Sequence, residues 1–208
     1  QISATDEPRF ALVVGEPGLG KTTLVRELRE RLPAGTTFRL GRCLSYGRSV
    51  TYSPLADVLR QELGLREEDP ALEQIAGNEI LGLTLGLDVA GDLEPRAAVL
   101  ALQDAWVLLV SDIGARGPAV VVLEDLHWAS EPLLELLARV LSGAAGPVLF
   151  LGTTRPGRAG LPPGDRLILE PLGDDEAGEL IDRALGGPLE AEARELVVRH
   201  ADGNPFFL

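Results

Sequence analysis

The sequence predicts an α/β fold in which helices flank a central, mostly parallel β-sheet. Short and nearly uninterrupted apolar runs alternate with longer segments of helical periodicity, which is typical of strands covered by helices on both faces. The chain has 208 residues, of which 45% are hydrophobic and 25% charged. This composition favours a folded chain with a sizeable core over a disordered one, and the length allows one domain with an appendage.

The first predicted elements are a strand, a glycine loop and a helix. Phe10–Val14 is an apolar run of β-formers, and the glycine-rich segment Gly15–Gly20 ends it. Lys21–Arg31 then places apolar residues at helical spacing. A second strand is predicted over Thr37–Cys43, and a strand, helix and strand in this order predict a parallel pair. We expect Cys43 to be a buried, inert thiol.

A helical insertion is expected over about residues 45–91. The Ser53-Pro54 pair suits the first turn of a helix over Tyr52–Gly64, and a further helix is predicted over Ala71–Leu87. Beyond the insertion, Pro95–Arg116 is apolar nearly all round, as in a buried helix.

Three strands and three helices complete the prediction. The strands are placed at Ala119–Leu123, Val148–Leu151 and Leu167–Leu169, and the helices at Glu131–Leu141, Asp174–Leu185 and Pro188–His200. The change to purely helical periodicity predicts a core over residues 1–172 and the beginning of a helical lid over 173–208. Because the chain contains no methionine and ends on apolar residues, we expect it to be a piece of a longer polypeptide.

Composition and charge disfavour several classes of function. The chain carries 19 basic and 32 acidic residues, a formal net charge of −13, and such a field repels nucleic acid. The predicted apolar strands are far shorter than a membrane span, and the chain opens without a signal pattern. We therefore expect a cytoplasmic chain that binds neither nucleic acid nor membrane directly.

The glycine loop carries the strongest motif, because residues 15–22 fit G-x-x-x-x-G-K-[ST] between a predicted strand and helix. This context predicts a P-loop NTPase. Lys21, the only lysine in the chain, is expected to reach the β and γ phosphates, and the Thr22 hydroxyl to coordinate Mg²⁺. The expected nucleotide-binding residues here are Gly15, Glu16, Pro17, Gly18, Leu19, Gly20, Lys21, Thr22 and Thr23.

Two carboxylates, Glu124 and Asp125, follow the strand at Ala119–Leu123, at the edge where open α/β sheets bind ligands. One is expected to hold Mg²⁺ through its water shell and the other to orient the attacking water. An acidic pair at a strand end is otherwise an exposed turn. For His127 and Trp128 we favour a packed aromatic and a hydrogen-bonded imidazole over catalytic roles.

The strand at Val148–Leu151 runs into Thr154 and Arg155. A hydroxyl and a guanidinium at this edge are suited to sensing the γ phosphate. The alternative is an ordinary polar turn before Pro156, and the residues leave both open.

Four motifs together resemble a known family: GEPGLGKTT at 15–23, VVVLEDLHWAS at 120–130, LGTTRP at 151–156 and GNPFFL at 203–208. The chain resembles the ATP-binding domain of the large LuxR-type transcriptional regulators of actinobacteria, which belong to the AAA-like signal-transduction ATPases with numerous domains (STAND). The resemblance implies five parallel strands with Glu124 on the metal side, Asp125 as the catalytic carboxylate and Arg155 as a sensor. It also implies a lid motif whose proline, Pro205, lies against the base.

The chain departs from this family in three ways. Residues 1–9 lack the usual Gly-Arg pair, Glu124 replaces a common aspartate, and no arginine finger is identifiable. Slow turnover is therefore expected.

The resemblance implies a regulatory switch that binds ATP or ADP with Mg²⁺ and whose partners are the other domains of its polypeptide. One alternative is an efficient oligomeric motor, which needs self-association to supply an arginine. Another is a P-loop kinase, against which the paired carboxylates argue.

Overall fold

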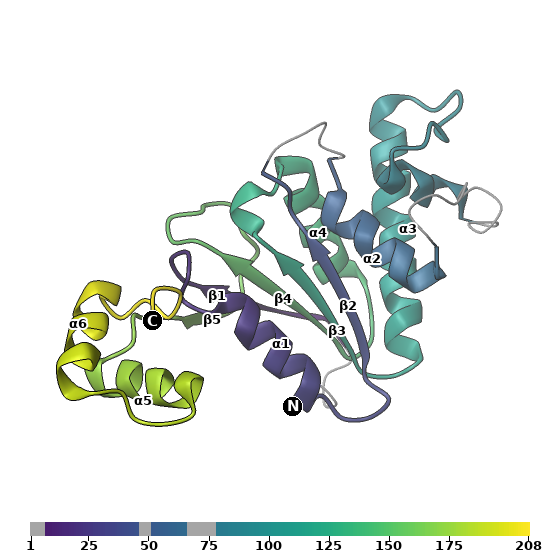
Figure 1. Ribbon diagram of the computed structural model, residues 1–208. Helices are drawn as coiled ribbons and strands as arrows, with labels where there is room; N and C mark the ends of the chain where they lie inside the picture. Colours follow the sequence, from purple (N-terminus) through teal and green to yellow (C-terminus); the bar gives the residue numbers. More distant parts are fainter. Residues whose placement is uncertain (1–6, 46–50, 66–77) are drawn as a thin grey trace.

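The computed structural model describes residues 7–45, 51–65 and 78–208, and in it five strands form one sheet of order β2-β3-β4-β1-β5 (Figure 1). Every neighbouring pair is parallel. The strands are β1 (Arg9–Val14), β2 (Thr37–Arg42), β3 (Ala119–Glu124), β4 (Val148–Thr154) and β5 (Asp165–Ile168). The helices are α1 (Lys21–Arg31), α2 (Ser53–Leu63), α3 (Pro95–Ala115), α4 (Glu131–Gly143), α5 (Asp174–Leu185) and α6 (Ala191–Ala201), with two short 3₁₀ helices, η3 (Glu79–Leu85) and η4 (Leu126–Trp128). The predicted five-stranded α/β fold is confirmed.

Two cores lie on the two faces of the sheet. On one face α1 packs Val25 against Val120 and Val122 of β3, and Figure 1 shows this helix crossing the sheet. On the other face Leu59 of α2 and Trp106 of α3 join the larger core. All six residues of β3 are buried, as the uninterrupted apolar run predicts for a central strand.

The helix predicted over Ala71–Leu87 is found in part, as a 3₁₀ helix over Glu79–Leu85. Residues 71–77 lie outside the described residues, and the remainder forms η3, which ends at Gly86 in a left-handed conformation, φ +79°. Gly82 lies tightly against Val89, so the chain folds back at once. The indole of Trp106 fastens this turn by donating to the Thr84 hydroxyl at 2.9 Å.

The two helices of the predicted lid, α5 and α6, pack on each other beside the β5 edge of the sheet (Figure 1). Helix α6 begins at Ala191, three residues later than the sequence pattern predicts. The chain enters and leaves this pair at one place, since the amide of Leu172 donates to the carbonyl of Gly203 at 2.7 Å. The division at residue 172 remains a prediction.

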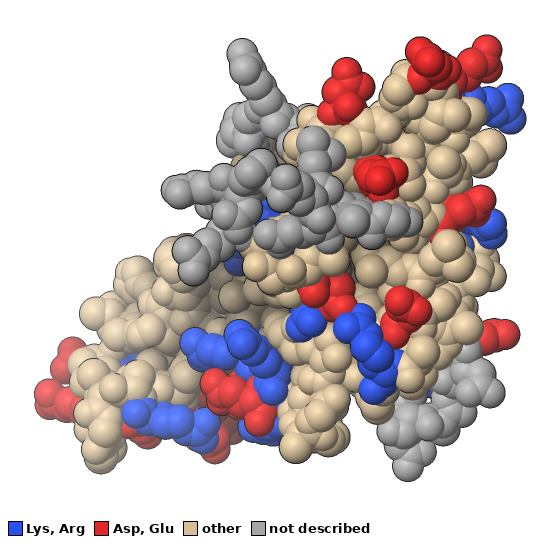
Figure 2. Space-filling view, turned by 90° about the vertical axis from the view of Figure 1, so that its right-hand side faces the viewer, with Lys and Arg blue, Asp and Glu red and all other residues tan. Residues whose placement is uncertain are grey.

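Helix α3 is long and apolar enough to cross a membrane by length and composition. One face of it, with Leu102, Trp106, Val110 and Ile113, is almost fully buried against the rest of the chain, whereas Leu100 and Leu108 are exposed, so the helix packs on the core by one face. On the face shown in Figure 2, basic and acidic side chains lie interspersed, and the described residues there form no continuous basic surface.

The thiol of Cys43 is 4% exposed, and burial raises its pKa to about 12. The thiol is therefore protonated at neutral pH, and the expectation of a buried, unreactive cysteine is confirmed.

Gly41 of β2 permits the close approach of α2, because a Cβ there would overlap the carbonyl of Pro54. We expect Gly41→Ala to lower the free energy of unfolding by about 1–3 kcal/mol, the usual cost of overpacking. Urea denaturation measures this loss. Gly187→Ala is the matched control, since a Cβ at Gly187 meets no heavy atom within 4 Å and should change stability by less than about 0.5 kcal/mol. Equal effects of the two substitutions would contradict the packing argument.

Candidate functional site

The glycine loop between β1 and α1 has the conformation that an anion site requires. Gly18 and Gly20 take φ values of +87° and +85°, which are unstrained only for glycine. Gly20 is also the N-cap of α1; within the described residues no side chain caps this helix, and its first turn holds no acidic residue. The amide groups and positive dipole end of α1 therefore suit a phosphate.

Lys21 lies folded onto this loop. Its Nζ donates to the carbonyls of Gly15 and Glu16 at 2.7 and 2.8 Å. Burial lowers the pKa of the ammonium most, Arg155 lowers it further, and Asp125 and Glu16 act in the opposite direction. The predicted phosphate-binding lysine thus lies within electrostatic reach of the predicted carboxylate and the predicted sensor.

The two adjacent carboxylates occupy different environments, as the sequence predicts. The Glu124 side chain is 3% exposed, and its Oε2 accepts hydrogen bonds from Nε and Nη2 of Arg42 at 3.0 and 2.5 Å. Asp125 lies just beyond β3 in a left-handed conformation, φ 59°, with its carboxylate 39% exposed. Its amide donates to the Thr153 hydroxyl at 3.0 Å.

The end of β4 lies directly beside the glycine loop. Val14 and Thr154 are register partners, and the amide of Gly15 donates to the Thr154 carbonyl at 3.2 Å. The Thr154 hydroxyl is buried and donates to the Arg155 carbonyl at 3.2 Å. Arg155 itself is exposed, and its charge acts on both Lys21 and His127. The sensor role and the ordinary polar turn before Pro156 both remain open for Arg155.

The expectation for His127 and Trp128 is wrong in part. Neither ring nitrogen of His127 has a hydrogen-bond partner among the described residues, although both are shielded from solvent, and Trp128 is 47% exposed. The two rings lie 5.1 Å apart at 44°. Burial lowers the pKa of His127, followed by the charge of Arg155, while Asp125 raises it. The imidazole is therefore a buried polar group without the hydrogen bond that the sequence suggests.

The lid motif contacts the glycine loop directly. The Asn204 side chain donates from Nδ2 to the Pro17 carbonyl at 3.1 Å. Its amide also fills the space beside Gly18, where a Cβ would clash. The lid motif therefore packs directly on the phosphate loop.

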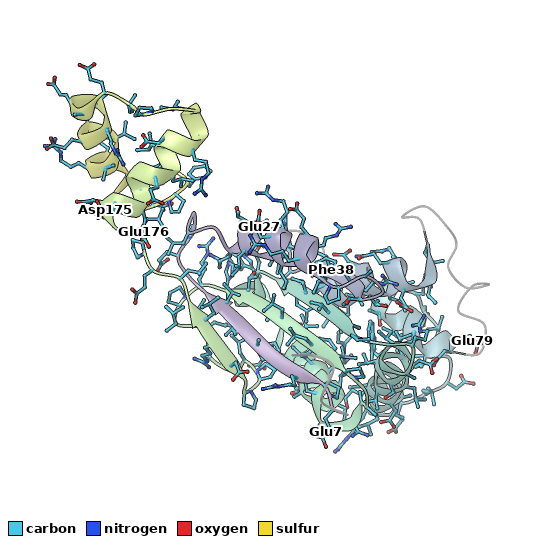
Figure 3. All side chains as sticks on the ribbon, turned by 90° about the horizontal axis from the view of Figure 1, so that it is seen from below. Glu7, Glu27, Phe38, Glu79, Asp175 and Glu176 are labelled. Carbon is cyan, nitrogen blue, oxygen red and sulfur yellow. The ribbon has the colours of Figure 1, made fainter. Side chains whose placement is uncertain are left out.

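A cavity of about 570 Å³ opens between α1 and the lid. Figure 3 shows Glu27 on α1 and Glu176 at the start of α5 on either side of the glycine loop. The remaining lining is largely leucine and includes the predicted base-contacting proline, with Leu19, Gly20, Thr23, Leu24, Leu169, Leu172, Glu179, Leu180, Arg183 and Pro205. The cavity thus combines leucine side chains with charged groups beside the phosphate loop, and base binding by Pro205 remains a prediction.

Within the described residues no group of three or more His, Cys, Asp or Glu side chains could hold a metal ion by itself. Proteins commonly bind Mg²⁺ through one or two side chains together with phosphate oxygens and water. Thr22 at the start of α1, Glu124 and Asp125 remain the predicted ligands. Glu124 would have to share its carboxylate with Arg42 or release it.

Arg42 escaped the sequence analysis, whereas Thr153 and Asn204 lie within its quoted motifs but were given no contact of their own. Arg42 is the register partner of Glu124 across the sheet, so pairing β2 with β3 in sequence could have suggested it. Thr153 and Asn204 are neighbours of predicted residues, but their hydrogen bonds depend on turn geometry that no sequence pattern encodes.

Comparisons with known proteins agree with this geometry. Residues 2–151 match the family model described as an AAA ATPase domain. The chain is 31% identical over 194 residues to an uncharacterised protein of Rhizobium meliloti (strain 1021), a match that covers 79% of this chain and 18% of that protein. The chain therefore spans less than a fifth of this relative.

Similar solved structures include two variants of RuvB from Thermotoga maritima. They give TM-scores of 0.53 and 0.52 at 18% and 16% identity and cover 97% and 96% of this chain and 51% of theirs. These likenesses show the fold. A STAND protein of Pyrococcus horikoshii with a tetratricopeptide repeat sensor gives a TM-score of 0.46 at 16% identity, over 96% of this chain and 26% of that one.

Lys21→Ala should abolish stabilisation by Mg·ATP, because it removes the charge expected to bind the β and γ phosphates. At a concentration about 100 times Kd, ligand binding contributes ~2.7 kcal/mol, which raises Tm by roughly 5–10 °C for a chain of this length. Thermal unfolding with and without Mg·ATP measures the shift. Arg26→Ala, which removes an exposed cation from the same helix, should retain it. Equal stabilisation of Lys21→Ala and the parent would overturn the phosphate-loop assignment.

Proposed function

The chain belongs to the AAA ATPase domain family, and on that premise we propose that it is a regulatory switch that binds Mg·ATP and hydrolyses it slowly. The observation that carries the proposal is the hydrogen bond from Asn204 of the lid to Pro17 of the phosphate loop at 3.1 Å. Because the lid rests on the loop that would wrap the phosphates, nucleotide binding is coupled to the position of α5 and α6.

Different residues of the phosphate loop and of the neighbouring strand ends would bind the phosphates, Mg²⁺ and the base. The amides of Gly18 and Gly20 and the Lys21 ammonium would hold the phosphates, and Thr22 with Glu124 would hold Mg²⁺. Bound Mg²⁺ neutralises charge on the phosphate oxygens. Further nucleotide contacts would come from Thr23, Thr154 and Arg155, with Pro205 against the base.

Asp125 would orient the attacking water. Its carboxylate is partly exposed and acts on Lys21 electrostatically, whereas Glu124 is buried against Arg42. This difference supports separate roles for the two carboxylates. Turnover should be slow, because the large accelerations in related chemistry come from an added arginine, worth about 10³–10⁵ in rate.

The wider role is proposed from the family resemblance. In a large LuxR-type transcriptional regulator, other domains of the polypeptide would sense a signal and bind DNA in the cytoplasm, while this segment reports nucleotide state. The net charge of −13 supports leaving DNA binding to those other domains. The match to only 18% of the Rhizobium meliloti protein agrees with a segment that occurs inside longer chains.

Asn204→Ala should uncouple the lid from the phosphate loop. In the parent we expect Mg·ATP to slow amide hydrogen exchange across α5 and α6, because the nucleotide orders the loop on which Asn204 rests. In Asn204→Ala this protection should fall several-fold while protection of β1 and α1 persists. Glu192→Ala, an exposed change within the same lid, is the control. Unchanged lid protection in Asn204→Ala would contradict the coupling.

The rate of ATP hydrolysis per chain should not depend on protein concentration. A switch that works within one chain needs no residue from a second copy, whereas an oligomeric motor would gain its arginine on association. Measuring the rate over a hundredfold range of concentration separates the two. A steep rise would favour the motor, and ADP release that requires an added acceptor would favour a kinase.

A further inference from the structure

The imidazole of His127 packs beside Trp128, with ring centroids 5.1 Å apart, but no hydrogen bond among the described residues uses its nitrogens. Its side chain is 12% exposed, and its two ring nitrogens have neither solvent nor a hydrogen-bond partner among the described residues. Buried polar atoms in native proteins are almost always hydrogen-bonded, and leaving one unsatisfied destabilises the fold. Phenylalanine or leucine would fill the same space without this cost.

The surroundings of His127 belong to the predicted phosphate site. Charges of Arg155, Lys21, Arg158 and Asp125 all act on the ring. These groups come from the loop that follows β4, the start of α1 and the residue that follows β3. The ring therefore lies beside charged groups that a bound nucleotide would contact.

The nearest polar approach is to Asp125. Nδ1 of His127 lies 3.9 Å from Oδ1 of Asp125, just beyond hydrogen-bond length. In nucleotide-free sites catalytic hydrogen bonds are often long and tighten when the substrate binds. The Asp125 backbone is held by Thr153, but its half-open carboxylate needs a side-chain donor to fix its direction.

We propose that His127 is a positioning residue, whose Nδ1–H donates to the Asp125 carboxylate in the nucleotide-bound state and holds it toward the attacking water. Nε2 then keeps its lone pair for a hydrogen-bond donor that enters the site. This inference rests on the proposed function and assigns a task to a residue that the ATP-binding motifs leave without one.

The test compares His127→Phe, which keeps the ring but removes both nitrogens, with His127→Asn, whose amide N–H replaces Nδ1–H. Without nucleotide, His127→Phe should raise Tm by about 2–4 °C, because two unsatisfied polar atoms disappear. The Tm increase with Mg·ATP should equal that of the parent. The kcat should fall about 10- to 100-fold in His127→Phe, as for a misplaced catalytic group, and return to within a few-fold of the parent in His127→Asn.

A double-mutant cycle with Asp125→Asn identifies the partner. If His127 acts through Asp125, the double variant His127→Phe/Asp125→Asn should have the same kcat as the single variant Asp125→Asn. The control is Trp128→Phe, which alters the neighbouring ring of the same turn and should preserve kcat.

Each outcome decides between the claims. Parental kcat in His127→Phe, a lowered Tm with no recovery of kcat in His127→Asn, or additive losses in the cycle would each overturn the positioning role. A parent that Mg·ATP stabilises but that turns over no ATP also overturns it and leaves the binding switch standing. A parent that Mg·ATP does not stabilise rejects the proposed function itself.

Discussion

The parallel pairing of β1 with β4 is the constraint on which the site depends. Their register places Val14 opposite Thr154, and the amide of Gly15 extends the ladder to the Thr154 carbonyl at 3.2 Å. On the other side of β4, the hydroxyl of Thr153 accepts a hydrogen bond from the backbone amide of Asp125 at 3.0 Å. One strand end therefore fixes the phosphate loop, the carboxylate and the sensor candidate relative to one another, as open α/β sheets do at their carboxyl edge.

Polar groups at this edge of the sheet are strained, desolvated or without hydrogen-bond partners among the described residues. The buried indole in the larger core, by contrast, is hydrogen-bonded. The Trp106 indole donates to Thr84 at 2.9 Å deep in the larger core. At the edge, Asp125 takes a left-handed backbone conformation at φ 59°, and Lys21 is partly desolvated. The ring nitrogens of His127 have no hydrogen-bond partner among the described residues. Strained or unsatisfied residues often lie at functional sites, so Asp125 and His127 support the predicted site with observations that do not come from the glycine motif.

Local patterns in the sequence were sufficient for the strands, the helices beside them and the phosphate loop, because each depends on residues close together in the chain. The helix expected over Ala71–Leu87 is described only from residue 78, where it is a 3₁₀ helix, and the proximity of Gly82 to Val89 in this turn is a contact that periodicity does not reveal. The Arg42–Glu124 pair spans 82 positions, and its formation depends on which strands are neighbours. The missing partner of His127 was equally unpredictable, since hydrogen bonding of a buried ring depends on the final position of every atom around it.

The contact between lid and loop also explains how a γ phosphate can act on α5 and α6 without touching them in the proposed switch. Lys21 holds the carbonyls of Gly15 and Glu16 at 2.7 and 2.8 Å, and the next carbonyl along, that of Pro17, accepts from Asn204. In the proposed switch, an ammonium that turns toward the β and γ phosphates would exchange the first two carbonyls for phosphate oxygens, and the bound nucleotide would then order the loop that Asn204 contacts. A population shift requires a ligand that binds the two states unequally, and in the proposed switch Lys21 would make this distinction because ADP and ATP offer it different numbers of phosphate oxygens. The lysine would then be both a binding group and the link between the nucleotide and the lid.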